Sequence, residues 1–352
     1  MSIEFLGHKK SLLQFILSHI EQEVSPEPSD FTDLFCGTSV VSAAFKKSGY
    51  KVTANDQLVW CSISAEAVLL NDGEPSFEGV IPFVEERQDT LFGSTMYGNV
   101  LAFLNSLPPK RDFIYRSYSP ASKRYSPFER MYFTEENAGR IDAIRAQIRE
   151  WDSLLTRGER ALLLWDLIRA ANAVSNIAGT YGCYLKHWKE RSLQTLMLTP
   201  SHIARNSLPH RVFCGDANEV AKNIRGSIVY ADPPYTKRQY AAYYHILETI
   251  AVGDEPALEG STGLRPWQEK SSDYCYKSKA PSALEDLVSK LQADHFFLSY
   301  NADGQIPHGS ILEILKKFGE VKFFEKPYRR YKSSGRPHKG ECVVERLYHL
   351  SF

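Results

Sequence analysis

Asp232-Pro233-Pro234-Tyr235 is the pattern in this 352-residue sequence that carries the most chemical information. It follows the apolar segment 227–231, which predicts a buried strand ending at the aspartate. A carboxylate and the carbonyl of the first proline can each accept one N–H of an aromatic amine, which localises the nitrogen lone pair. The prolines fix the backbone and add no competing donor, and the tyrosine offers a flat face for stacking. The pattern therefore indicates chemistry on the exocyclic amine of a nucleobase.

A second group of residues predicts a nucleoside-containing cofactor. Gly37 lies in the turn 36–39 after an apolar segment, and Asp56 follows the next predicted strand, 19 residues later. The double-glycine fingerprint of dinucleotide binding is absent, which favours a ligand without pyrophosphate. Asp56 can accept hydrogen bonds from ribose hydroxyls, and Asp33 can hold the amino group of an amino acid. Adenosine joined to an amino acid is S-adenosylmethionine. Taken alone, each residue also has a purely structural interpretation, with Gly37 as a turn residue and Asp56 as the cap of the following helix.

Alternating strands and helices must position these motifs. This rhythm predicts a mainly parallel sheet that is covered on both faces. Ligands of such sheets bind beyond the carboxyl ends of the strands, which is where both motifs lie. The expected strands are 31–35, 50–54, 211–215, 227–231, 295–300, 320–324 and 342–350, and the expected helices are 9–24, 40–47, 57–70, 241–252, 282–292 and 308–318.

The rhythm is lost between about 72 and 205, where two helical patterns near 134–152 and 158–175 dominate. We therefore expect a catalytic domain formed by 1–74 and 206–352, with 75–205 inserted as a mostly helical target-recognition domain. Net charge is +0, but residues 105–211 hold 17 Lys or Arg against 10 Asp or Glu, which allows a basic face for nucleic acid.

The remaining composition indicates a cytoplasmic enzyme. No segment of about 18 uncharged apolar residues predicts a membrane span, and the N-terminus does not resemble a signal peptide. The six cysteines are scattered without a CxxC pair, which favours free thiols in a reducing compartment over disulfides or a zinc site. The ligand spacing implies no metal.

Together these motifs resemble the DNA N6-adenine methyltransferases of the alpha group, related to Dam and to methylases partnered with restriction enzymes. The order matches, with a cofactor motif, a glycine turn, an insertion and then the Asp-Pro-Pro-Tyr motif. The resemblance implies a Rossmann-like α/β fold with a seven-stranded sheet. It assigns catalysis to Asp232, Pro233, Pro234 and Tyr235, and cofactor binding to Phe5, Lys9, Asp33, Phe35, Gly37, Thr38, Ser39, Asp56, Asp216 and Ala217.

Within this resemblance, Lys9 would meet the methionine carboxylate and Asp216 would lie beside the cofactor adenine. The sequence departs from many relatives at Thr38-Ser39, where a second small residue, often glycine, is usual. The implied partner is double-stranded DNA bound by a monomer, with a cognate restriction enzyme as a candidate further partner. The expected DNA contacts are Tyr181, Lys186, Arg238, Tyr240, Arg330 and Lys332.

Other targets stay open on the sequence alone. Related signatures act on the N4 amine of cytosine, on adenine in RNA or on a protein glutamine amide. The basic insertion and an aspartate at position 232 favour adenine in DNA, because protein amide methylation more often uses asparagine there. A non-catalytic DNA-binding subunit is a different class of hypothesis, which the intact motif at 232–235 disfavours.

Overall fold

The computed structural model describes residues 9–24, 30–84, 95–329 and 342–352. They divide into two compact units, which we describe separately. The first, called the sheet unit, is drawn from Gly7–Ala65, Asn206–Tyr240 and Lys270–Phe352. The second, called the helical unit, includes Glu66–Arg205 and Ala241–Glu269.

One seven-stranded sheet forms the centre of the sheet unit, in the order β3-β2-β1-β4-β5-β7-β6. The pairs β3–β2, β2–β1, β1–β4 and β4–β5 are parallel, whereas β7 runs antiparallel to both β5 and β6. The predicted α/β class with a mainly parallel sheet is therefore confirmed. The strands are β1 (Asp30–Asp33), β2 (Lys51–Asp56), β3 (Arg211–Cys214), β4 (Arg225–Ala231), β5 (Gln292–Asn301), β6 (Glu320–Arg329) and β7 (Cys342–Ser351).

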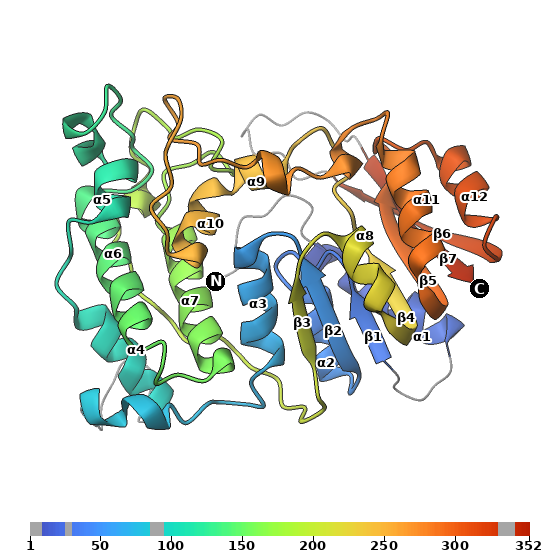
Figure 1. The fold of residues 1–352 in the computed structure, drawn as a ribbon, viewed down its shortest axis with the longest axis horizontal. Helices are drawn as coiled ribbons and strands as arrows, with labels where there is room; N and C mark the ends of the chain where they lie inside the picture. The colour runs from blue at the N-terminus through green and yellow to red at the C-terminus, as the bar shows by residue number, and fades with distance from the viewer. Residues whose placement is uncertain (1–8, 25–29, 85–94, 330–341) are drawn as a thin grey trace. The chain divides into compact units, whose positions relative to one another are not determined.

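Helices cover both faces of this sheet (Figure 1). On one face, apolar residues of α8, α11 and α12 form a single buried cluster with β4 and β5. On the other face, the Phe45 ring of α2 stacks on Phe31 of β1, with centroids 3.6 Å apart. The helical elements are η1 (Lys9–Ser11), α1 (Leu13–Glu23), α2 (Val40–Lys47), α3 (Val59–Leu69), α8 (Ala217–Val220), η5 (Ala221–Asn223), η7 (Asp273–Cys275), α11 (Ala280–Lys290) and α12 (His308–Leu315).

The helical unit contains both helices that were predicted for the insertion, together with two further helices there that were not predicted. The predicted helices 134–152 and 158–175 correspond to α6 (Glu135–Glu150) and α7 (Arg157–Ala173). The part of the insertion that precedes them contains α4 (Met96–Ser106) and α5 (Phe113–Tyr118), which the sequence did not predict. The shorter elements are η2 (Glu78–Phe83), η3 (Pro120–Arg124), η4 (Glu190–Leu193), α9 (Tyr240–Tyr243), α10 (His245–Val252) and η6 (Gln268–Lys270), of which α9 and η6 cross between the units.

The strand–helix rhythm groups 241–269 with the catalytic domain, whereas the structure groups these residues with the helical unit. Side chains of the insertion explain the difference, because they hold carbonyls of this segment. The Arg130 guanidinium donates to the carbonyls of Gly260 at 3.0 Å and Ser261 at 3.2 Å. The Tyr118 hydroxyl donates to the carbonyl of Gly263 at 3.0 Å. Among the described helices, none has the length and apolar character needed to cross a membrane.

Candidate active site

The Asp-Pro-Pro-Tyr motif follows β4 and lies beside the end of β1. Asp33 is paired with Tyr230 across these two parallel strands. The register continues one residue further, where the N–H of Leu34 donates to the carbonyl of Tyr230 at 3.0 Å. Asp232 follows Tyr230 by two residues. The glycine turn and the Asp-Pro-Pro-Tyr motif therefore both follow the carboxyl ends of two neighbouring parallel strands.

The turn after β1 is held in a conformation that brings its backbone close to the ends of the neighbouring strands. Gly37 has a φ of 51° and Ser39 a φ of 57°, both in the left-handed region that favours glycine. The N–H of Gly37 donates to Asp56 Oδ2 at 2.9 Å, while Asp56 Oδ1 accepts from the N–H of Leu58 at 3.0 Å. Asp56 therefore fixes the glycine turn to the end of β2. Thr38, between the two left-handed residues, is half-buried.

Asp33 places a buried carboxylate at the end of β1. One of its oxygens accepts a hydrogen bond from Ser42 Oγ at 2.6 Å, and the other, Oδ1, has no well-aligned donor among the described residues. Burial raises the pKa of Asp33 to about 7, against hydrogen bonding from Ser42 and from the backbone of Phe35, and with help from the carboxylates of Asp232 and Asp56. A buried acceptor without a donor is costly unless a ligand supplies one.

Asp232 lies in a buried cluster of charges. Its Oδ1 is 3.0 Å from Lys9 Nζ, and Lys9 also forms an ion pair with Glu345. The side chain of Asp232 is 16% exposed, whereas those of Lys9 and Glu345 are 6% and 1% exposed. Burial raises the pKa of Asp232 to about 7, which the Lys9 ammonium opposes and the Glu345 carboxylate supports. Asp232 is thus the member of the cluster that a ligand can reach most easily.

Tyr235 is half-buried beside this cluster. Its ring lies edge-on to Tyr300, with centroids 6.0 Å apart, and the Lys9 ammonium is 5.6 Å from the ring centroid. Its carbonyl accepts from the N–H of Gln305 at 3.0 Å. Pro233 is buried, which leaves the backbone of the motif rigid.

The remaining predicted cofactor residues of the sheet unit lie at the ends of β1 and β3. Asp216 is exposed and caps α8, accepting from the N–H groups of Asn218 at 2.9 Å and Glu219 at 3.2 Å. Ala217 is buried, and Phe35 packs against the apolar cluster beneath α11. Asp216 therefore has a structural role already, and its predicted place beside the adenine stays a prediction.

The predicted DNA contacts fall into three groups. Lys186 and Arg238 are exposed and Tyr240 is half-buried, so a partner can reach all three. Tyr181 is fully buried inside the helical unit, where its hydroxyl donates to Asn172 Oδ1 at 3.2 Å, and this corrects its place among the DNA contacts. Three predicted residues lie outside the described ones, namely Phe5, Arg330 and Lys332.

Sequence reasoning missed Glu345 as a member of this site. It lies in β7, opposite Asn301 of β5, and accepts from Ser299 Oγ at 2.7 Å. The one available signal was an acid within the otherwise mostly apolar segment 342–350, which a half-buried strand usually exposes. Its partner Lys9 is separated from it by 336 positions, a pairing that no sequence pattern reports.

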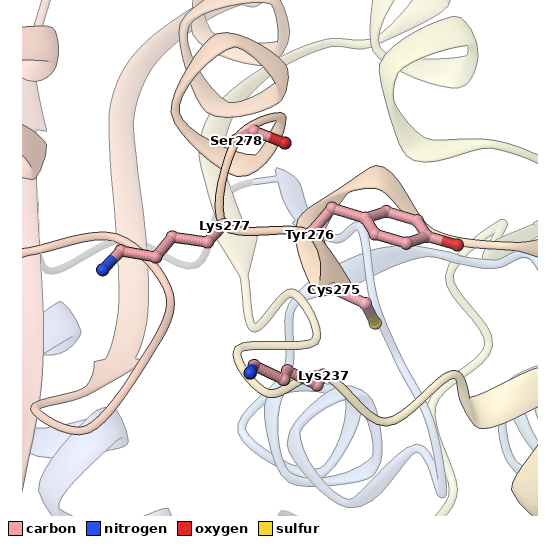
Figure 2. A pocket seen from close by; sticks show the side chains of 5 residues that line it. All are labelled: Lys237, Cys275, Tyr276, Lys277 and Ser278. Atoms are coloured by element: carbon pink, nitrogen blue, oxygen red, sulfur yellow. The ribbon is translucent and has the colours of Figure 1, made fainter.

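Sequence reasoning also missed a basic pocket in the sheet unit, next to the loop that follows the motif. Lys237 lines it from this loop, and the neighbouring segment adds Lys277 (Figure 2). The two segments are joined because the N–H of Ser272 donates to Gln239 Oε1 at 2.8 Å and Gln239 Nε2 donates back to the carbonyl of Ser272 at 3.0 Å. The complete lining is Lys237, Cys275, Tyr276, Lys277 and Ser278.

Comparison with known proteins adds independent information. A family model described as D12 class N6 adenine-specific DNA methyltransferase matches residues 5–303. The chain is 39% identical to the type II methyltransferase M.FokI of Planomicrobium okeanokoites, over 97% of this chain and 51% of that protein. It is 36% identical to the modification methylase StsI of Streptococcus sanguinis, over 99% of this chain and 52% of that one. It is 35% identical to the type II methyltransferase M.NlaIII of Neisseria lactamica, over 99% of each. The chain thus spans about half the length of the first two relatives and nearly all of the third.

Proposed function

We propose that this chain, which belongs to the D12 class of N6 adenine-specific DNA methyltransferases, transfers a methyl group from S-adenosylmethionine to the N6 amine of adenine in double-stranded DNA. The match to the family confirms the resemblance seen in the sequence. The observation that carries the proposal is the accessible carboxylate of Asp232, which lies at the end of β4 beside the glycine turn after β1.

The residues at the ends of β1 and β2 fit S-adenosylmethionine. Asp33 Oδ1 is a buried acceptor that lacks a well-aligned donor, as an ammonium site requires. Gly37 adds no side chain to the turn, and the Asp56 carboxylate, which has about four acceptor sites, lies beside this turn and accepts from the N–H groups of Gly37 and Leu58. We therefore assign the cofactor ammonium to Asp33 and the ribose hydroxyls to Asp56. When bound, S-adenosylmethionine supplies an electrophilic methyl carbon on a positively charged sulfur.

The residues of the motif prepare the amine. Asp232 and the carbonyl of Pro233 each accept one N–H, which favours a tetrahedral nitrogen with a localised lone pair. Tyr235 offers its ring face to the base. Because the amine is paired inside a duplex, the adenine must leave the stack before it reaches Asp232. Holding the two reactants in line is expected to supply much of the rate.

Exposed cations near the motif support DNA as the partner. Lys237 and Arg238 follow the motif directly, and Lys277 lies on the segment joined to this loop. Phosphate contacts of this kind position a duplex without reading its sequence. We assign these three side chains to the DNA backbone, and add to the proposal that the chain acts as a monomer on DNA, with a cognate restriction enzyme as a further partner.

Replacing Asp232 tests the proposed role directly. We expect Asp232→Ala to lower the rate of methyl transfer to duplex DNA by about 100-fold or more, because one of two amine acceptors is lost. Tritium transfer from labelled S-adenosylmethionine measures the rate, and calorimetry measures cofactor binding, which should change little. Asp294→Ala, at an exposed position of β5 away from the motif, serves as the matched control. Turnover of Asp232→Ala at the level of that control would refute the assignment.

A further inference from the structure

We propose that Glu345 is a positioning residue for methyl transfer, which anchors the Lys9 ammonium so that Lys9 favours the ionised form of Asp232 through one carboxylate oxygen and leaves the other oxygen for the target amine. The inference rests on the proposed function, since it gives Asp232 the role of amine acceptor. It differs from the role that the resemblance gives Lys9, namely contact with the methionine carboxylate.

Lys9 contacts both carboxylates of the cluster. Lys9 Nζ forms its closer contact with Glu345 Oε1 and lies 3.0 Å from Asp232 Oδ1. Although burial works against the charged form, the carboxylates of Asp232 and Glu345 keep the pKa of Lys9 well above its ordinary value. With all three groups ionised, the cluster carries one net negative charge. Lys9 is thus shared between Asp232 and Glu345.

Glu345 is itself fixed from two sides. Ser299 Oγ donates to its Oε1 at 2.7 Å, and Asn301 Nδ2 donates to its Oε2 at 3.4 Å. Both donors belong to β5, which pairs with β7 along its length, and Glu345 is fully buried. A carboxylate held in this way gives the flexible lysine side chain a rigid anchor.

The other titratable groups around this cluster are few. Asp33 approaches Asp232 from the end of β1, while Tyr230 and Tyr235 come from β4 and the motif. The pKa of Tyr230 is raised by burial and by Asp232, so this phenol stays neutral near pH 7. Lys9 and Glu345 are therefore the charges that most directly set the ionisation of Asp232, with opposite signs.

Without Glu345, the ammonium has Asp232 as its remaining carboxylate partner. It would then pair fully with Asp232 and compete with the target amine for the same oxygens. Without Lys9, two carboxylates would face each other in a buried site, and Asp232 would hold its proton to higher pH. The two substitutions should therefore shift the ionisation of Asp232 in opposite directions.

Three variants test these opposite shifts in the ionisation of Asp232, namely Glu345→Gln, Lys9→Met and the double variant. We expect kcat of Glu345→Gln to fall roughly 10–100-fold from lost alignment at the reacting amine, with cofactor affinity changed less than about twofold. The acid limb of the kcat–pH profile should lie lowest for Glu345→Gln and highest for Lys9→Met. The double variant restores a single negative charge, so its limb should return close to wild type, with higher kcat at pH 7 than Lys9→Met alone.

Several results would overturn the inference. One is a double variant that is slower than either single variant, with additive losses and with no shift in the acid limb of any kcat–pH profile. This result would indicate two independent structural roles. Another is a main effect of Lys9→Met or Glu345→Gln on cofactor affinity, since this would return Lys9 to the methionine carboxylate. Glu325→Gln on β6, whose carboxylate accepts from Arg346 at 2.7 Å, is the matched control and should behave as wild type.

Thermal unfolding separates this inference from the proposed function. Because Asp33 has a similarly raised pKa, the four proteins are compared in an Asp33→Asn background. There, stability falls with rising pH until the pH reaches the folded pKa of Asp232, so the start of the plateau should follow the same order. This measurement does not depend on activity. If one variant folds poorly, the remaining variants still define the order of the pH values at which the plateaus begin. A wild type that does not methylate adenine would refute the proposed function alone. A plateau that starts at the same pH in all four proteins would refute the inference alone.

Discussion

At the scale of single residues, the site combines acids that ordinary folding would avoid. Asp33 is buried and the nearby Asp232 is only partly exposed, and burial raises the pKa of each to about 7. Structural acids are normally paired or exposed. Asp232 has the Lys9 ammonium as a partner, whereas Asp33 has no cation among its described contacts. The free-energy cost of burying the Asp33 carboxylate without a cation is offset if a positively charged ligand binds beside it.

The raised pKa of Asp33 gives a prediction for stability. A carboxyl with a folded pKa of about 7 and an ordinary unfolded pKa binds more protons in the folded state between these values, so stability falls as pH rises from about 4 to about 7. We expect Asp33→Asn to be more stable than wild type at pH 8, on the order of 1–3 kcal/mol, with the difference vanishing near pH 4. Urea unfolding at both pH values measures this. A variant that is less stable at pH 8 would contradict the account of Asp33.

Asp56 gives a prediction for cofactor affinity. Asp56→Asn keeps one acceptor for the backbone of Gly37 or Leu58 but loses the charge that strengthens hydrogen bonds to ribose. We expect the cofactor dissociation constant to rise roughly 10–100-fold, with kcat nearly unchanged at saturation. Asp30→Asn, at the opposite end of β1, is the control. An Asp56→Asn protein with wild-type affinity would remove Asp56 from the cofactor site.

At the scale of elements, the sequence predicts the helices and strands that have a periodic pattern of apolar residues. The helix of 40–47 is observed with these bounds, and every predicted strand is found within a few residues. The predicted helix 9–24 instead divides into η1 and α1, which places Lys9 in a separate short turn. Lys9 and Glu345 meet only because β7 inserts between β5 and β6, a tertiary arrangement without a local signal. Tyr181 was misassigned because an aromatic residue in a polar segment reads the same whether it is buried or exposed.

The start of α7 offers a test of the helical unit alone. Thr156 Oγ1 accepts from the N–H of Glu159 at 3.2 Å, and the Glu159 carboxylate accepts from the N–H of Thr156 at 2.9 Å, forming a capping box. We expect Thr156→Ala to lower the free energy of unfolding by about 1 kcal/mol, with cofactor affinity unchanged. Chemical denaturation measures the loss, against exposed Ser153→Ala as control. A change within the error of that control would show that the cap contributes nothing.

The loops around the basic pocket should control DNA affinity. We expect Lys237→Ala and Lys277→Ala each to weaken binding similarly on all duplex sequences and to reduce the slope of log affinity against log salt by about 1. Fluorescence anisotropy over a salt series measures both. Lys317→Ala is the control; Lys317 lies just after α12 and pairs with Glu285 at 2.8 Å. An unchanged slope in both pocket variants would place the DNA backbone elsewhere.

At the scale of the whole molecule, zero net charge does not oppose a nucleic-acid partner, because the charges are unevenly distributed. Residues 105–211 carry a surplus of seven positive charges, 17 minus 10. The family match and the relatives at 35–39% identity support adenine in DNA as the target.

The identity of the methylated base tests the central claim most directly. Duplex DNA is incubated with the protein and labelled S-adenosylmethionine, digested to nucleosides and separated by liquid chromatography with mass detection. The account predicts label in N6-methyladenine, and its loss in Asp232→Ala. Label in N4-methylcytosine, or adenine methylation that survives in Asp232→Ala, would contradict it.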